Sequence, residues 1–185
     1  MRKAILLLVL LVVWTGGAIY CFNTYVSPPK AVAYEVTVPR NVNIDKFISR
    51  VNPKLDPAIR SIIVESINAN AEKKGLDPAL IASVMARETE FNPLASNKNR
   101  DGSTDHGIMS INDKYQAERI KKRKLSVSDL YHINTSVDLG TDILRENVTR
   151  YVTVRSALQA YVGLSHRTYV SDVLSLYGEM QWEAR

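Results

Sequence analysis

A four-residue pattern that occurs twice determines where two helices begin. Leu55-Asp56-Pro57-Ala58 recurs as Leu76-Asp77-Pro78-Ala79. Asp is a favourable N-cap because its side chain accepts a hydrogen bond from a free backbone N–H, and Pro suits the first helical position, where its missing N–H is not needed. Gly75 is a suitable end for the first helix, since glycine tolerates the left-handed conformation that closes helices. The repeat therefore predicts two consecutive helices, as a shared start signal and not as the unit of a solenoid.

Both predicted helices have an apolar face at helical spacing. In the first helix this face consists of Ile59, Ile62, Ile63 and Ile67, and in the second of Leu80, Ile81, Val84 and Met85. Further helices are expected over about 135–150, 153–161 and 167–178. Residues 91–113 are rich in Asn, Asp, Ser and Gly, and a polar segment of this length between helices is more often functional than a simple connection. We expect a mainly helical domain over residues 55–185, with one turn-rich β-hairpin insertion.

The sequence begins with a segment of a different kind. Arg2 and Lys3 precede an uncharged stretch from Ala4 to Phe22. As a helix rising about 1.5 Å per residue it would span about 28 Å, close to the roughly 30 Å hydrocarbon core of a bilayer. Positive charge before the stretch, and none after it until Lys30, places the N-terminus in the cytoplasm. Residues 1–22 are therefore predicted to be a transmembrane anchor that crosses the membrane through residues 4–22, with the remaining domain outside the cytoplasm.

A cleaved signal peptide is the alternative to an anchor. Signal peptidase sites need small residues, whereas Tyr20, Cys21 and Phe22 follow the apolar stretch. Residues 23–54, which contain Pro28, Pro29 and Pro39, are expected to be a tether with at most a short edge strand over residues 34–38. Cys21 is the only cysteine, so the exported part has no disulfide and no cysteine-based metal site or nucleophile.

The net charge of +5 is mildly basic and suits an anionic wall or membrane surface without requiring one. The basic residues Arg119, Lys121, Lys122, Arg123 and Lys124 form a run that is either a solvated loop or a contact with wall polymers or lipid. A nucleic-acid partner is not expected outside the cell.

Glu88 continues the apolar series of the second helix. Ile81, Val84, Met85 and Glu88 are spaced i, i+3, i+4 and i+7, which carries the carboxyl group toward the core side of the helix end. Burial disfavours the charged form and raises a carboxyl pKa, and a protonated acid near neutral pH can donate a proton to a glycosidic oxygen. The alternative is a boundary residue paired with a nearby cation such as Arg87. Spacing alone leaves both interpretations open.

The segment from Glu88 to Asn112 resembles the active-site segment of c-type lysozyme and that of the specialised lytic transglycosylases of bacterial secretion, pilus and conjugation systems. The match has no gaps and includes Phe91, Ala95, Asn97, Asn99, Asp101, Gly102, Ser103, Asp105, Gly107, Ile111 and Asn112. The likeness to the transglycosylases extends over about residues 55–180. It includes Leu76-Asp77-Pro78, Asn134 with Gly140, the stretch Ala157–Tyr161, and Tyr169-Val170. Because c-type lysozymes carry disulfides that are absent here, the transglycosylases are the better match for the whole chain.

This resemblance implies a lysozyme-like α+β fold, with the β-hairpin at the active-site cleft, and an enzyme that cleaves the β-1,4 bond between N-acetylmuramic acid (MurNAc) and N-acetylglucosamine (GlcNAc) of peptidoglycan. Glu88 corresponds to the catalytic acid and Asp105 to its ionised partner. Substrate contacts are expected from Thr89, Phe91, Ser110, Asn112 and Tyr161. A lytic transglycosylase needs neither metal nor cofactor and leaves a 1,6-anhydro-MurNAc end. A lysozyme-type hydrolase, with Asp105 acting on C1, is the alternative.

The chain departs from the family pattern at two positions. Ser110 stands where these families usually have Gln, and Tyr161 is followed by Val162-Gly163 where they usually continue as Tyr-Asn-x-Gly. These changes keep a second class of function open, that of a glycan-binding component with little activity. In either class, a secretion, conjugation or phage injection assembly is a possible partner.

The polar segment has two further features. Asn97, Asn99, Asp101 and Gly102 imitate the start of a calcium loop, but Ile108 stands where such a loop needs Glu, so no metal is expected. His106 either lines the cleft or is a partly exposed turn residue.

Overall fold

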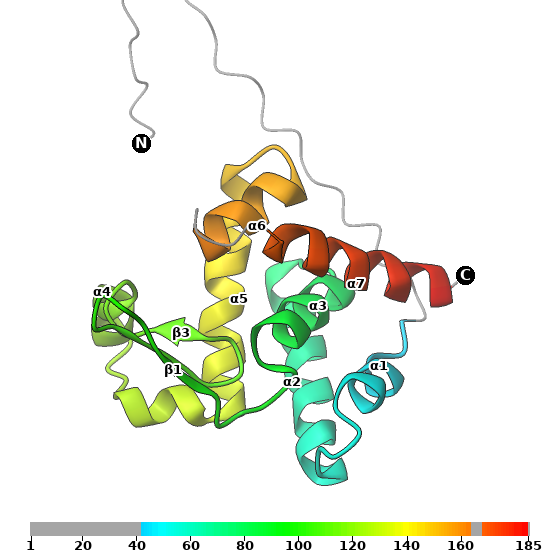
Figure 1. The fold of residues 1–185 in the computed structure, drawn as a ribbon, viewed down its shortest axis with the longest axis horizontal. Helices are drawn as coiled ribbons and strands as arrows, with labels where there is room; N and C mark the ends of the chain where they lie inside the picture. Colours follow the sequence, from blue (N-terminus) through cyan, green and yellow to red (C-terminus); the bar gives the residue numbers. More distant parts are fainter. Residues whose placement is uncertain (1–41, 164–167, 185) are drawn as a thin grey trace, which may run out of the picture. The chain divides into compact units, whose positions relative to one another are not determined.

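The computed structural model describes residues 42–163 and 168–184 (Figure 1). This part of the chain is mainly helical, as the sequence predicted, and contains one antiparallel sheet, which has a third strand besides the predicted hairpin. The elements are α1 Ile44–Val51, α2 Pro57–Lys74, α3 Pro78–Thr89, β1 Ser96–Lys98, β2 Thr104–His106, β3 Ile111–Asn112, α4 Ala117–Lys122, the 3₁₀ helix η1 Val127–Tyr131, α5 Ile133–Arg150, α6 Val154–Val162 and α7 Tyr169–Glu183.

Both predicted helix starts are confirmed. Asp56 Oδ1 accepts hydrogen bonds from the N–H groups of Ala58 and Ile59 at 2.8 and 3.2 Å. Asp77 Oδ1 accepts one from Ala79 N–H at 2.8 Å. Gly75 ends α2 in the left-handed conformation, with a φ of 59°. The repeated pattern therefore sets the length of α2 and the start of α3.

The core is built around α3, which packs against α1, α2 and α7. Figure 1 shows it among these three helices. Every residue from Ala79 to Ala86 is buried, so this helix is covered on all sides and not only on the predicted apolar face. The apolar face of α2 is narrower than expected, because Ile63 and Ile67 are buried but Ile62 is 40% exposed.

The predicted tether boundary is wrong in one respect. Residues 44–51, which were assigned to the tether, form α1, and its Ile44, Phe47 and Ile48 are buried in the core. Asn43 caps this helix by accepting a hydrogen bond from Lys46 N–H at 2.9 Å. The folded domain therefore begins at least ten residues before Leu55.

Residues 23–41 of the tether, with its possible strand, and the predicted anchor at residues 1–22 lie outside the described residues. Within residues 42–163 and 168–184, no helix combines the length and apolar character needed to cross a membrane.

The polar segment forms the predicted hairpin. β1 pairs with β2 in antiparallel register, with Asn97 opposite Asp105, and the short strand β3 extends the sheet by placing Asn112 opposite Asp105. The connecting turn closes through the hydrogen bond from Asn99 N–H to Ser103 O at 2.8 Å. The register therefore places one asparagine on each side of the Asp105 carboxylate.

Candidate active site

Glu88 lies in the last turn of α3, where the buried residues of the helix end and the following residues are partly exposed. Its Oε1 accepts a hydrogen bond from the Tyr169 hydroxyl at 2.5 Å. Tyr169 is buried and stands at the start of α7, so the carboxyl group is held from an element far away in the sequence.

The environment of Glu88 favours the protonated acid. Burial raises the pKa of Glu88 to about 7, from an ordinary value of 4.5. Hydrogen bonds from Tyr169 and Ser110 and the charge of Arg87 act in the opposite direction, while the negative charge of Asp105 adds to the rise. Burial also raises the pKa of Tyr169, so its hydroxyl stays a donor. A carboxyl group with this pKa can donate a proton at neutral pH and then act as a base.

The alternative interpretation of Glu88, an ion pair with Arg87, is not what the structure contains. Arg87 Nε instead donates to Asp172 Oδ2 of α7 at 2.9 Å. The guanidinium group lies 5.6 Å from the centre of the Tyr169 ring.

Asp105, in the middle of β2, is fixed by three amide groups. Asn97 and Asn99 donate to its Oδ2 at 3.4 and 3.0 Å, and Asn112 donates to its Oδ1 at 2.7 Å. The side chain keeps partial exposure. The asparagines that imitate a calcium loop therefore orient this carboxylate.

Ser110 closes a turn that is anchored on several sides. Gly107 begins the turn with a φ of 70°, and a Cβ there would lie 2.0 Å from Leu130 O. Thr89 donates to Ile108 O at 3.0 Å, and the Tyr161 hydroxyl donates to Met109 O at 3.3 Å. These contacts fix the turn against the end of α3 and against α6. Ser110 itself adopts a positive φ of 49° and hydrogen-bonds to Glu88.

The predicted substrate-binding residues therefore differ in their surroundings. Thr89, Ser110 and Tyr161 gather around Glu88 through the anchored turn, and they stay candidates for contact with the glycan. Asn112 also stays partly exposed, although its amide nitrogen already donates to Asp105 and Ser103.

The prediction for Phe91 is wrong. Its side chain is fully buried and packs edge-on against Phe47 of α1, with ring centres 6.0 Å apart. Phe91 is a core residue because α1, which the sequence analysis assigned to the tether, covers it.

His106 is neither a turn residue nor an exposed one. It ends β2, is 7% exposed, and lies within hydrogen-bond distance of the Tyr131 hydroxyl at 2.7 Å and of Asp113 Oδ2 at 3.3 Å. It joins the sheet to η1.

Tyr169 is the residue that the sequence prediction missed as part of the site. Nothing local in the sequence indicates that its hydroxyl meets a carboxyl group 81 positions earlier. The resemblance of Tyr169-Val170 to the Tyr-Val pair of the transglycosylases is a signal that points to it.

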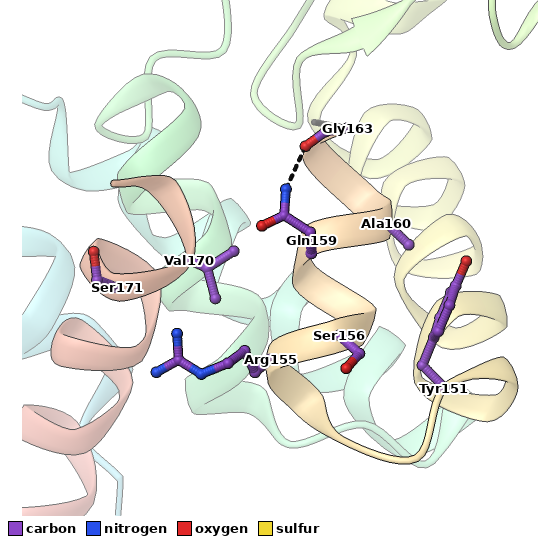
Figure 2. A pocket seen from close by; sticks show the side chains of 8 residues that line it. All are labelled: Tyr151, Arg155, Ser156, Gln159, Ala160, Gly163, Val170 and Ser171. Carbon is purple, nitrogen blue, oxygen red and sulfur yellow. Dashed lines mark hydrogen bonds between the residues drawn. The ribbon is translucent and has the colours of Figure 1, made fainter. Parts of the chain in front are cut away.

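A separate hollow of about 700 Å³ lies between α6 and the first turn of α7 (Figure 2). It is lined by Tyr151, Arg155, Ser156, Gln159, Ala160, Gly163, Val170 and Ser171. Neither Glu88 nor Asp105 belongs to this lining, so the hollow is distinct from the carboxyl pair.

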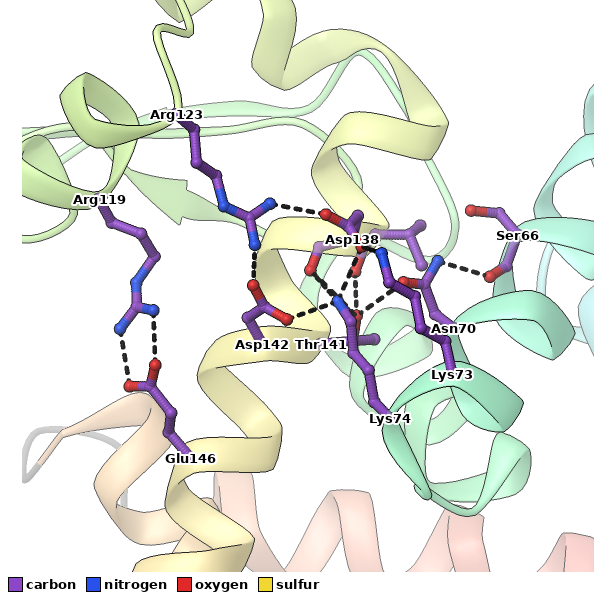
Figure 3. A network of polar contacts seen from close by, with 11 residues as sticks. Ser66, Asn70, Lys73, Lys74, Arg119, Arg123, Asp138, Thr141, Asp142 and Glu146 are labelled. Carbon is purple, nitrogen blue, oxygen red and sulfur yellow. Dashed lines mark hydrogen bonds and ion pairs between the residues drawn. The ribbon is translucent and has the colours of Figure 1, made fainter.

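The basic run at residues 119–124 is only partly solvated. Arg119 pairs with Glu146 through two contacts of 2.7 and 2.8 Å. Arg123 contacts Asp138 at 2.6 Å and also pairs with Asp142, in a network that joins α2 to α5 through Lys74 (Figure 3). The two arginines therefore hold α4 and its C-terminal end against α5, while Lys121, Lys122 and Lys124 are exposed.

Comparison with known proteins identifies the family. Residues 65–167, more than half of the chain, match the family model described as the transglycosylase SLT domain. The chain belongs to the transglycosylase SLT domain family. The matched range begins in α2 and includes α3, the sheet and α6, so it contains Glu88 and Asp105.

Relatives of this SLT domain include bacterial, phage and animal proteins. Invasion protein IagB of Salmonella typhimurium is 34% identical over 116 residues, which are 61% of this chain and 71% of that protein. The transglycosylase of Enterobacteria phage PRD1 is 32% identical over 99 residues, which are 54% of this chain and 34% of that protein. Lysozyme C of Crax fasciolata is 39% identical over 56 residues, which are 30% of this chain and 42% of that protein. No solved structure gives a significant match.

Proposed function

We propose that this SLT domain is a peptidoglycan lytic transglycosylase in which Glu88 is first the general acid and then the general base. The observation that carries the proposal is the environment of Glu88, where burial raises the pKa of the carboxyl group to about 7 while one oxygen is held by Tyr169. Family membership supplies the substrate, the glycan strands of peptidoglycan.

The reaction proceeds in two steps. Protonated Glu88 donates its proton to the oxygen that links C1 of MurNAc to C4 of GlcNAc, the C1–O bond breaks, and GlcNAc leaves with a free 4-hydroxyl. The Glu88 carboxylate then takes the proton from the C6 hydroxyl of the same MurNAc, whose oxygen bonds to C1. The product is a 1,6-anhydro-MurNAc end, and Glu88 is protonated again. No water is consumed.

Asp105 has a supporting role in this scheme. Positive charge develops at C1 as the bond breaks, and an oriented carboxylate stabilises that charge. Asp105 suits this role because its three amide contacts hold it in one orientation. Thr89, Ser110, Asn112 and Tyr161 are proposed to contact the sugars around the two carboxyl groups.

The proposal is tested by incubating the purified chain with bacterial wall sacculi and analysing the released fragments by mass spectrometry. Anhydro-MurNAc ends are expected. Glu88→Gln should abolish their release, whereas Glu90→Gln, which changes an exposed carboxyl group two positions away, should not. Reducing MurNAc ends would instead assign the hydrolase mechanism. Binding to sacculi without any released fragment would assign the glycan-binding component.

We further propose that residues 4–22 anchor the domain in the inner membrane, with the domain in the periplasm, so that it opens the wall locally for an envelope-spanning or phage assembly. The names of the invasion protein and of the phage transglycosylase support such a setting. With α1 in the folded domain, about 20 residues remain between the anchor and the domain, and a coil of this length reaches about 25 Å. Deleting residues 1–22 while restoring export should spread wall damage, and unchanged localised damage would contradict the anchor.

A further inference from the structure

The hydrogen bond between Tyr169 and Glu88 joins two helices that are distant in the sequence. Glu88 ends α3 and Tyr169 begins α7. The N-cap residue of α7, Thr168, makes no side-chain capping hydrogen bond. The position of the Tyr169 hydroxyl therefore depends on what fixes the first turn of α7 against α3.

A second contact links the same two turns. Arg87, the neighbour of Glu88, reaches Asp172, which lies three residues after Tyr169 and on the same side of α7. The guanidinium group also lies over the Tyr169 ring, 5.6 Å from its centre. Arg87 thus contacts both ends of the first turn of α7, and the four residues form a closed set with two members on each helix.

The orientation of Tyr169 decides which oxygen of Glu88 can react. Its hydroxyl donates to Oε1 and remains a donor because burial raises its pKa. The proton of the neutral acid is therefore left on Oε2. In this arrangement Oε2 is also the oxygen that accepts the proton from the C6 hydroxyl in the second step.

Catalytic groups tolerate little displacement, since an error of about 1 Å can cost about 100-fold in rate. By contrast, the Arg87–Asp172 pair is 37% and 41% exposed, and an ion pair with this exposure contributes little to global stability. A positioning role predicts a loss of rate without a matching loss of stability.

We propose that Arg87 and Asp172 are positioning residues that hold the Tyr169 hydroxyl on Oε1 of Glu88 and so present Oε2 to the glycosidic oxygen. The proposal rests on the function proposed above for Glu88. In this proposal Arg87 acts through Tyr169 and not by contact with the substrate.

The chain offers a closely matched control at the other end of α7. Arg50 of α1 pairs with Glu179 and Glu183 of α7 at 2.8 and 2.7 Å, and its guanidinium lies 5.4 Å from the ring centre of Phe47 on the same helix. This set also combines an arginine, carboxylates of α7 and an aromatic ring, but it lies outside the contacts of Glu88. Arg50→Met should therefore cost at least as much stability as Arg87→Met and leave the rate within about twofold of wild type.

The test compares the full chain with Arg87→Met, Asp172→Asn and Asp172→Glu in the release of anhydro ends and in thermal unfolding. Arg87→Met and Asp172→Asn are expected to lower kcat by roughly 10- to 100-fold with little change in KM. Their melting temperatures should be no lower than that of Arg50→Met. Asp172→Glu should restore most of the rate. In a Tyr169→Phe background, Arg87→Met should have no further effect, because its action passes through the missing hydroxyl. Full activity of Arg87→Met, or an equal loss in the Tyr169→Phe background, would overturn the proposal.

A second measurement separates this proposal from the function on which it rests. Titration of the Glu88 carboxyl by carbon NMR is independent of turnover. Because Tyr169 donates to the carboxyl and lowers its pKa, Asp172→Asn should raise the pKa of Glu88 while leaving the charge of Arg87 in place. If the wild-type chain is inactive but Asp172→Asn still raises the pKa of Glu88, the proposed transglycosylase activity is refuted and the positioning contact is kept. An unchanged titration in Asp172→Asn would refute the positioning contact.

Discussion

Replacing Glu88 with Gln should remove activity and, at alkaline pH, make the protein more stable. Gln keeps the size of the side chain and carries no charge. In the folded protein burial raises the pKa of Glu88 to about 7, whereas the ordinary value is 4.5. The folded state therefore binds this proton more tightly than the unfolded state does, and ionising Glu88 costs folding free energy.

The magnitude follows from the interval between the two values. Each pH unit between the two values corresponds to roughly 1.4 kcal/mol, so the separation of 4.5 from about 7 gives a cost on the order of 3 kcal/mol. Glu88 is partly exposed, and solvent screening reduces the expected cost to about 2–3 kcal/mol. Linkage fixes the sign of this stability difference. Below pH 4.5 Glu88 is protonated in both the folded and the unfolded state, so its ionisation costs no folding free energy. Between pH 4.5 and 7 the wild type loses stability relative to the variant, and above pH 7 the difference stays constant.

The assay is urea unfolding of wild type and Glu88→Gln at pH 4, 5.5, 7 and 8.5. The difference in unfolding free energy between the two proteins cancels the titration of all other groups. The expected difference is small at pH 4 and reaches about 2–3 kcal/mol in favour of the variant at pH 8.5.

Two results would refute this reasoning. A difference that does not change with pH would mean that Glu88 is not forced toward its neutral form in the folded protein. A wild type that becomes relatively more stable as pH rises would mean that the carboxylate is the favoured form, as in an ion pair. Either result would remove the physical basis for Glu88 as an acid at neutral pH.

Three other variants test separate parts of the domain. Asp105→Asn should slow the release of fragments by roughly 100-fold while the ends remain anhydro, and mass spectrometry would detect any change of product. Gly107→Ala should lower the unfolding free energy by roughly 3 kcal/mol or more, measured with urea, because its φ of 70° disfavours a side chain and the new Cβ would overlap Leu130 O. Asp138→Asn should cost roughly 1–3 kcal/mol of unfolding free energy above pH 4. Burial alone would raise the pKa of Asp138, but hydrogen bonds from basic side chains hold that pKa well below its usual range. This stability is lost as pH falls, so the difference between wild type and variant should close toward pH 2 in acid-unfolding curves.

The sequence predicted those parts of the fold that short-range rules determine. An N-cap Asp followed by Pro acts within one turn, and for this reason the starts of α2 and α3 were predicted correctly. The position of Glu88 followed from helical periodicity counted along α3. The hairpin was predictable because Asn, Asp, Ser and Gly favour turns by local hydrogen bonding.

Parts that depend on contacts between distant segments could not be predicted in the same way. The helix α1 has only eight residues, and its burial depends on α2 and α3. The incorrect role of Phe91 follows from this omission, because Phe47 of α1 covers the ring. The contact of Tyr169 with Glu88 likewise requires α7 to pack on α3, which no local pattern reveals.

Ser110 shows how a departure from the family pattern can leave the acid intact. The residue usually found at this position has a longer side chain with an amide, whereas Ser110 offers a hydroxyl group at a positive φ of 49°. The turn that carries it is held by Thr89 and Tyr161, so the short side chain still reaches Glu88 and hydrogen-bonds to it. The acid thus keeps two hydroxyl partners, Ser110 and Tyr169. We therefore expect the loss of the longer side chain to act on the proposed contact with the glycan. On this basis the change at position 110 should alter which glycan is preferred, and not whether Glu88 can act.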